Sequence, residues 1–547
     1  MRLLIFVGLL LAACTPAPPF DPALVEGDAG SGIRRDLVHV TVPLPVPALD
    51  GTKTPANLNQ LTVVRYRLDT GKKAPKPAKA IVILMPGFLA GAGSFDGLAR
   101  ALVRRSAPGE VLEAWAVERR ANALEDRLGE EAAIDAGSGQ PIVDYYFDGG
   151  MVAERKFGGF LAQSDAGFMS EWGLKMTEED LRAVIALVPD ADRVKRVVLA
   201  GHSLGGQIAA QYAAWDFAGT PGYTDLAGLV MIDAVTGGEG GVSYDGGVVI
   251  TEQQYEVDGF DDPTGFGHVD SLASIRATNR FFELPILSSS LYVIGFDAAL
   301  RARLNPDGFE VDAPRGYALQ QLFLLDRLPA MTNRAAFGFA FDVHSCPLSI
   351  AGVNAGEAVG PEEEVASPFG GGMLARPSDP TVKYTWKDYD QVDPHEYTSL
   401  TDFSFAWTRG GVDFGEWYFP QRLNLDTFAA QSLVMQPADW AYANHGLRAQ
   451  HGREIACPVM VVAAGLVQTA TAYDALKAIL PPVGAGRPQG GAQRNTVSGY
   501  EALEYPMLSH LDPLSGADVA NSPVRDWYDH LASFAKRVTP SGGVVIP

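Results

Sequence analysis

Cysteine is scarce in this sequence: three occur among 547 residues, at positions 14, 346 and 457. No Cys-x-x-Cys pair, His-Glu-x-x-His segment or Gly-x-x-x-x-Gly-Lys-Ser loop is present, so the common zinc and nucleotide-phosphate motifs are missing. No metal or cofactor is therefore expected. In an oxidising compartment Cys346 and Cys457 could form a disulfide, and two buried thiols are the alternative.

Clusters of lysine and arginine are also missing, and the formal net charge is -22 at pH 7. Nucleic-acid binding needs grouped cations that release counterions from the phosphates, so a nucleic-acid partner is excluded. The excess of acidic residues instead favours solubility. Nothing in the composition indicates an oligomeric state.

The N-terminus predicts an export signal. Arg2 precedes an apolar run from Leu3 to Leu11, which is shorter than the about 20 residues that a membrane-spanning helix needs. The ending Leu-Ala-Ala-Cys14 resembles the lipobox of bacterial lipoproteins, which implies a signal peptide of residues 1–13 and a lipid on Cys14 as membrane anchor. Thr15, rather than aspartate, follows the cysteine, and by the same resemblance this favours the outer membrane or cell surface. An ordinary cleaved signal peptide is the alternative.

Seven apolar, β-branched runs predict the strands of one sheet. Near-continuous apolar runs suit strands that are buried on both faces of a parallel sheet. Several runs are followed by segments with apolar residues at helical spacing, so we expect an α/β fold with a mostly parallel sheet flanked by helices. The runs are 37–42, 61–66, 80–85, 111–117, 194–200, 226–232 and 458–464, and the helical segments are 176–188, 204–214 and 471–480.

The chain is longer than the roughly 250 to 300 residues at which a single core stops growing, so insertions are expected. Over 236–455 frequent turns and dense aromatic residues predict a cap-like insertion domain between the sixth and seventh core strands. The core then comprises 36–235, with a smaller insertion at 127–171, and 456–538. Residues 14–35, rich in Pro, Gly and Asp, predict a flexible tether.

The segment Gly201-His202-Ser203-Leu204-Gly205 carries the strongest chemical signal. It lies directly after the strand run 194–200 and directly before the helical segment 204–214. A serine hydroxyl becomes an effective nucleophile on such a tight turn, where glycines relieve clashes and the helix N-terminus offers N–H groups to an oxyanion. Ser203 is therefore the predicted nucleophile.

With these flanking elements the chain resembles the α/β-hydrolase family of esterases and lipases over residues 80–233 and 458–514. The family carries its general base on a histidine after the last strand, which implies His510 in the segment 505–512. Asp512 is expected to be a turn or cap residue. Among the other histidines, His268 in the insertion is the main rival.

The third member of the catalytic triad is the acid, a carboxylate that partners the histidine. The sequence indicates its position less clearly than those of Ser203 and His510. The family usually places it shortly after the penultimate strand, where this chain has Gln468. Some relatives place the acid one strand earlier, which implies Asp233 at the end of run 226–232, with Asp474 as the alternative. Its carboxylate would hold the imidazole in the right tautomer and stabilise the imidazolium.

The oxyanion hole is expected to combine the backbone N–H of Leu204 with a second N–H from the loop after run 80–85. Phe88 is the predicted second donor, and Leu89 is the alternative. The family often has His-Gly at this place, whereas this chain has Pro86-Gly87. A backbone donor tolerates that difference.

Together these residues predict a serine hydrolase that cleaves carboxylic esters through an acyl-enzyme on Ser203. A small-molecule or lipid ester is the expected substrate, and the aromatic residues of the insertion are expected to form mainly its own core. A peptidase or amidase on the same fold is one alternative. A non-catalytic, surface-displayed binding protein is another, and its main support is the amide at Gln468.

Overall fold

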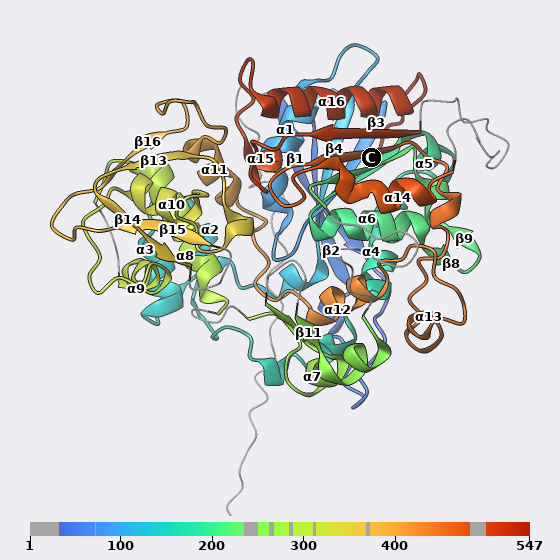
Figure 1. Ribbon diagram of the computed structural model, residues 1–547, viewed down its shortest axis with the longest axis horizontal. Helices are drawn as coiled ribbons and strands as arrows, with labels where there is room; N and C mark the ends of the chain where they lie inside the picture. The colour runs from blue at the N-terminus through green and yellow to red at the C-terminus, as the bar shows by residue number, and fades with distance from the viewer. Residues whose placement is uncertain are drawn as a thin grey trace, which may run out of the picture.

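The computed structural model describes residues 32–71, 73–234, 250–261, 267–283, 288–309, 313–367, 372–481 and 499–546 (Figure 1). The predicted signal peptide (1–13), Cys14 and the tether up to residue 31 lie outside these ranges. Within the described residues, no helix has both the length and the apolar character that crossing a bilayer requires.

An eight-stranded sheet forms the centre of the molecule, in the order β1-β2-β4-β3-β7-β10-β17-β18. β2 is antiparallel to both of its neighbours, and the strands from β4 to β18 run parallel. This is the α/β-hydrolase sheet that the sequence resemblance implies. The strands are β1 (Ile33–Thr41), β2 (Gln60–Leu68), β3 (Ala80–Met85), β4 (Leu112–Glu118), β7 (Val197–His202), β10 (Gly228–Ile232), β17 (Val459–Ala463) and β18 (Tyr500–Glu504).

Each predicted run overlaps one of these strands, with two corrections at the boundaries. Residues 194–196 end the helix α5 (Asp190–Arg196), so β7 begins later than the apolar pattern indicates. β1 begins at Ile33, inside the predicted tether 14–35, because Ile33 and Arg35 are buried and pair with β2. β18 has no apolar run, because it is an edge strand whose side chains are partly exposed.

Helices cover both faces of the sheet. Every residue of β3, β4, β7, β10 and β17 is buried, and alternate side chains enter two separate hydrophobic clusters. α1 (Asp96–Arg104) and α16 (Pro523–Val538) pack on one face. α4 (Leu174–Ile185), α6 (Leu204–Ala214) and α14 (Asp474–Ile479) pack on the other, and Figure 1 shows α16 and α6 on opposite sides of the strands. Burial on both faces explains the continuous apolar runs.

Two stretches of chain leave the sheet. The first follows β4 and contains α2 (Leu128–Ala136), α3 (Gln140–Ile142) and the hairpin of β5 (Met151–Val152) and β6 (Arg155–Lys156). The second lies between β10 and β17, the sixth and seventh core strands. Its helices are α7 (Leu272–Ala277), α8 (Ser290–Leu304), α9 (Ala313–Leu322), α10 (Asn333–Phe341), α11 (Leu400–Trp407), α12 (Gln421–Ala429) and α13 (Trp440–His445).

The second stretch also forms three two-stranded sheets, and α8 to α11 gather with two of these sheets beside the main sheet (Figure 1). Phe341, Phe403 and Phe414 pack around Trp407, whose ring stacks on Phe414 with centroids 4.4 Å apart, and this aromatic group joins the hydrophobic cluster on one face of the sheet. The paired strands are β11 (Phe260–Asp261) with β12 (His268–Val269), β13 (Gly356–Val359) with β16 (Thr385–Asp388), and β14 (Glu362–Ala366) with β15 (Met373–Pro377).

Cys346 and Cys457, both among the described residues, are buried thiols that no disulfide joins. The disulfide alternative is therefore wrong. The Cys346 thiol donates a hydrogen bond to Leu348 O at 3.1 Å, and burial raises its pKa to about 12. A thiol in this environment stays protonated and unreactive at neutral pH.

Candidate active site

Ser203 lies on the turn between β7 and α6, at the carboxyl edge of the sheet. Its backbone is left-handed, with φ 55° and ψ -129°, and its N–H donates to Ile232 O at 3.0 Å. The turn is so tight that a Cβ on Gly201 would come within 2.0 Å of Gly205 O. Such strain is typical of a residue whose side chain is held out for chemistry.

The loop after β3 packs directly against this turn. A Cβ on Gly87 would lie 2.9 Å from Ser203 Cβ, so only glycine allows this approach. Within the described residues, neither the backbone N–H of Phe88 nor that of Leu204 donates a hydrogen bond. Both N–H groups are thus available beside Ser203.

His510 and Asp233 meet at the same edge. His510 follows β18, Asp233 follows β10, and His510 Nδ1 lies 2.6 Å from Asp233 Oδ2. The fully buried Asp233 carboxylate also accepts the backbone N–H groups of Ala464 (2.8 Å), Leu466 (2.7 Å) and Val467 (3.1 Å). The loop in which the family usually carries its acid therefore binds a carboxylate from the neighbouring strand.

The surroundings keep Asp233 ionised. Burial alone would raise its pKa, but the hydrogen bond and charge of His510, together with the N–H groups of Leu466 and Val467, hold the pKa below its ordinary value. Asp233 can thus stay charged beside an imidazolium at neutral pH.

His202 makes a contact that the sequence pattern does not indicate, because His202 lies inside the turn beside Ser203. Its ring lies 4.3 Å from the ring of His510, and its Nε2–H donates to His510 O at 2.8 Å. Burial, followed by the charge of His510, lowers the pKa of His202 to about 3. A neutral His202 can support His510 without repelling its protonated form.

Among the described residues, Ser203 Oγ forms no hydrogen bond to the His510 ring, a contact that often tightens only when substrate binds. Over the described ranges, Asp474, the alternative acid, forms no hydrogen bond to His510, and His268, the alternative base, forms none to Asp233. Asp474 is exposed at the start of α14, and His268 is about half exposed and lies 3.3 Å from Asp261.

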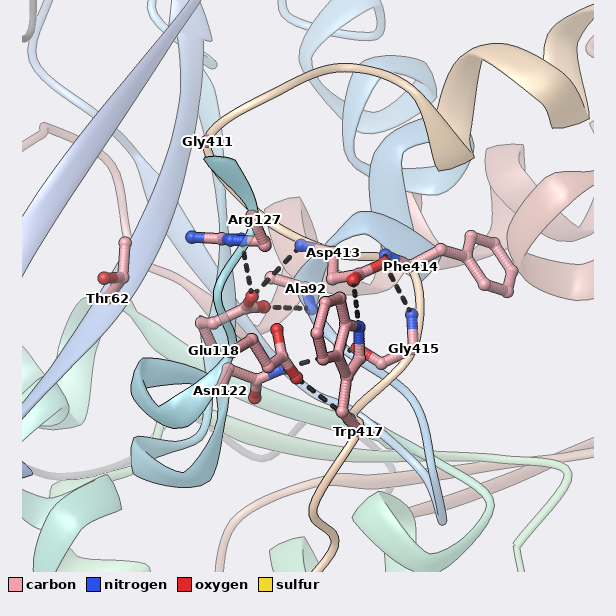
Figure 2. Close-up of polar contacts among 12 residues, drawn as sticks. Thr62, Ala92, Glu118, Asn122, Arg127, Gly411, Asp413, Phe414, Gly415 and Trp417 are labelled. Atoms are coloured by element: carbon pink, nitrogen blue, oxygen red, sulfur yellow. Dashed lines mark hydrogen bonds and ion pairs between the residues drawn. The ribbon is translucent and has the colours of Figure 1, made fainter. Parts of the chain in front are cut away.

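Buried charges hold the loop after β3 from the other side. Figure 2 shows the Glu118 carboxylate, at the end of β4, between Arg127 and the backbone N–H groups of Ala92 (2.6 Å) and Asp413 (3.2 Å). The N–H groups of Gly91 and Gly93 in turn donate to Phe414 O and Asp413 O at 2.8 and 2.9 Å. Residues 413–414 of the second insertion are therefore bound to the loop that faces Ser203.

One group in the second insertion has side chains of the kind that bind metals. Possible ligand atoms of Asp342, His344 and Glu396 lie within 4.8 Å of one another. The carboxylates already accept backbone N–H groups of His344, Ala355 and Gly356, so they hold the insertion's own backbone.

No family model matches this chain, and none of the curated proteins compared with it matches. Solved structures do resemble it. A candidate lipase from Sulfolobus solfataricus is 12% identical with a TM-score of 0.44, over 92% of this chain and 95% of the other. A peroxisomal alpha-beta-hydrolase from Saccharomyces cerevisiae is 10% identical with a TM-score of 0.37, over 94% and 92%. The Paleococcus ferrophilus monoacylglycerol lipase is 10% identical with a TM-score of 0.30, over 87% and 99%. The strand order, rather than these likenesses, defines the fold.

The pKa of Glu118 predicts a pH-dependent stability. Burial raises this pKa from 4.5 to about 7, so the folded protein binds the proton more tightly than the unfolded chain. The resulting stabilisation is complete below pH 4.5 and is lost as the pH rises through 7. We expect the unfolding free energy of wild type minus that of Glu118→Gln to fall by roughly 3 kcal/mol over this window.

Urea denaturation at several pH values between 5 and about 8 measures this difference. Glu364→Gln, at an exposed position of β14, is the control for the loss of one carboxylate. A difference that stays constant with pH, or that grows as the pH rises, would contradict the expectation.

Proposed function

We propose that this protein is a serine hydrolase that cleaves carboxylic esters through an acyl-enzyme on Ser203. The observation that carries the proposal is the 2.6 Å contact between His510 Nδ1 and the buried Asp233 carboxylate, formed at the same sheet edge as the strained Ser203 turn. These are the nucleophile, base and acid that acyl transfer requires.

The proposed reaction has two steps. Ser203 Oγ attacks the ester carbonyl while His510 Nε2 takes its proton, and the same proton then goes to the departing alcohol. A water molecule, activated by His510, next attacks the acyl-enzyme and releases the acid and Ser203. In both steps the oxyanion would accept hydrogen bonds from the N–H groups of Phe88 and Leu204.

Asp233 would fix the tautomer of His510. A carboxylate on Nδ1 requires the proton on that nitrogen, which leaves Nε2 as the acceptor for the serine proton. The same carboxylate would stabilise the imidazolium that forms in each step. This assignment is favoured over Asp474, which is exposed.

Apolar side chains near the turn favour an ester with an apolar acyl or alcohol group. The Phe88 ring lies edge-on to Phe282 and Phe419 of the second insertion, with centroid distances of 5.0 and 4.8 Å. Leu204 and Val467 are only partly buried in the same cluster. The insertion would thus act as a cap that contributes an apolar wall and excludes water.

We also propose that the chain is exported and held at a bacterial outer membrane or cell surface by a lipid on Cys14. The support is the lipobox-like Leu-Ala-Ala-Cys14 ending of the apolar N-terminal run. A small-molecule or lipid ester would then reach the enzyme from outside the cell or from the membrane.

A fluorophosphonate probe tests for the activated serine. We expect rapid labelling of wild type, no labelling of Ser203→Ala, and labelling slowed by about three to four orders of magnitude in Asp233→Asn, because the acid sets the imidazole tautomer. Asp474→Asn, the same charge change at an exposed position, is the matched control and should label like wild type. Folded wild type that does not label would overturn the proposal in favour of a binding protein.

The substrate class is tested with two panels of chromogenic compounds. We expect turnover of p-nitrophenyl esters, with kcat/KM rising with acyl length by about tenfold or more, because each added CH₂ buried in an apolar pocket contributes about 0.8 kcal/mol. Little turnover of aminoacyl anilides is expected. The reverse preference would assign a peptidase instead of an esterase.

Lipid attachment is tested by growing cells with a radiolabelled fatty acid. We expect the label to enter the mature protein and to be absent from Cys14→Ser, because acylation needs the thiol. Cys346→Ser is the control, since that thiol is buried. Secretion of an unlabelled wild-type protein would instead indicate an ordinary signal peptide.

A further inference from the structure

Arg119 binds the loop that follows β3 through its backbone carbonyls. Its Nη1 donates to Pro86 O at 2.7 Å, and its Nη2 donates to Gly87 O at 2.8 Å and to Ala90 O at 3.0 Å. The residue directly follows β4 and is only 6% exposed. The guanidinium therefore takes the place of water as the hydrogen-bond donor to three backbone carbonyls of one loop.

A carboxylate from the second insertion orients this guanidinium. Glu416 Oε2 accepts from Arg119 Nε at 2.9 Å and from Nη2 at 2.5 Å, and Glu416 is fully buried. The backbone N–H of Glu416 donates to Leu89 O at 2.9 Å. Arg119 also lies over the Phe419 ring, 5.3 Å from its centroid. Glu416 thus binds both the loop and the side chain that holds the loop.

Peptide geometry links these contacts to the oxyanion hole. In a trans peptide the C=O and the following N–H point in opposite directions. The Gly87–Phe88 peptide is not among the cis bonds, so a Gly87 C=O directed at Arg119 turns the Phe88 N–H away from Arg119. Gly87 itself faces Ser203, because its Cβ position would be 2.9 Å from Ser203 Cβ. The direction of the predicted oxyanion donor therefore depends on Arg119.

We propose that Arg119, oriented by Glu416, is a positioning residue that fixes the oxyanion hole by holding the carbonyls of Pro86, Gly87 and Ala90. The inference rests on the proposed function. Arg119 acts through the Phe88 N–H, and among the described residues it forms no hydrogen bond to Ser203. The N–H that Arg119 positions stabilises negative charge that develops only in the transition state. Loss of the Arg119 side chain therefore lowers kcat more than it changes KM.

Lysine cannot take over this role. The planar guanidinium presents five N–H donors in a fixed fork, and Arg119 uses them on three carbonyls and a carboxylate at once. An ammonium group has three donors on a flexible stem and cannot reach all four acceptors. Between these contacts Leu89 has a left-handed backbone, with φ 58°, which the surrounding bonds hold in place.

The test is steady-state hydrolysis of p-nitrophenyl butyrate by the full-length chain in detergent. Removal of one oxyanion donor typically lowers kcat by about 100- to 1,000-fold. We expect Arg119→Lys to lower kcat by about 10- to 1,000-fold, with KM changed by less than about threefold. A trifluoromethyl ketone, which forms an oxyanion on the serine, should lose affinity by a similar factor.

Arg120→Lys is the matched control. Arg120 is the next residue, is 1% exposed, and pairs with Asp180 at 2.8 Å; within the part of the chain that the structure describes, it forms no hydrogen bond to the loop after β3. We expect it to lose stability as Arg119→Lys does, but to keep its kcat and its affinity for the ketone. Circular dichroism checks that each variant is folded. If Arg119→Lys does not fold, Glu416→Gln, which keeps the side-chain shape, replaces it in the test. This variant should likewise lower kcat while leaving KM nearly unchanged.

Two negative results remain distinguishable. Unchanged kcat in folded Arg119→Lys and Glu416→Gln, or a fall in Arg120→Lys as large as in Arg119→Lys, would overturn the positioning role alone. Wild type that neither turns over esters nor labels with a fluorophosphonate would overturn the proposed function, and this inference with it.

Discussion

The buried hydrogen bond between Asp233 and His510 joins parts of the chain that are 277 residues apart in sequence. It can form because β10, β17 and β18 are adjacent parallel strands whose carboxyl ends meet at one edge. The same carboxylate binds three backbone N–H groups of the loop after β17. Removing the charge would leave these donors buried without an acceptor, so the loop and the histidine depend on one side chain.

A second set of buried charges organises the opposite side of the site. Glu118 and Arg119 follow one another at the end of β4, and each binds the loop after β3 as well as the second insertion. Burying such charges is costly unless every one is paired or hydrogen-bonded. The insertion supplies the pairing in Glu416 and the backbone of residue 413, so it helps to hold this side of the site in place.

The parts of the fold that the sequence predicts are those that local pattern determines. Strands buried on both faces have continuous apolar runs, so the central strands are evident, whereas the edge strand β18 is not. Ser203 is indicated by a short motif between a strand and a helix. His510 and Asp233 follow from their position after strands once the family resemblance is recognised.

The remaining site contacts depend on the path of the insertion, which no local pattern specifies. Arg119 and Glu416 are 297 residues apart, and nothing in either neighbourhood indicates the other. Whether Cys346 and Cys457 form a disulfide likewise depends on where the insertion folds. His202 lies beside Ser203 in sequence, but its contact with His510 requires the loop after β18 to be in place.

The position of the second insertion also constrains how the chain is completed during synthesis. β10 leaves the ribosome long before its neighbour β17, which begins at residue 459, so one edge of a wholly apolar strand stays unpaired in the interval. Unpaired apolar edges are sites of misassembly. The sequence order therefore places the whole insertion between the synthesis of β10 and that of the strand that completes its pairing.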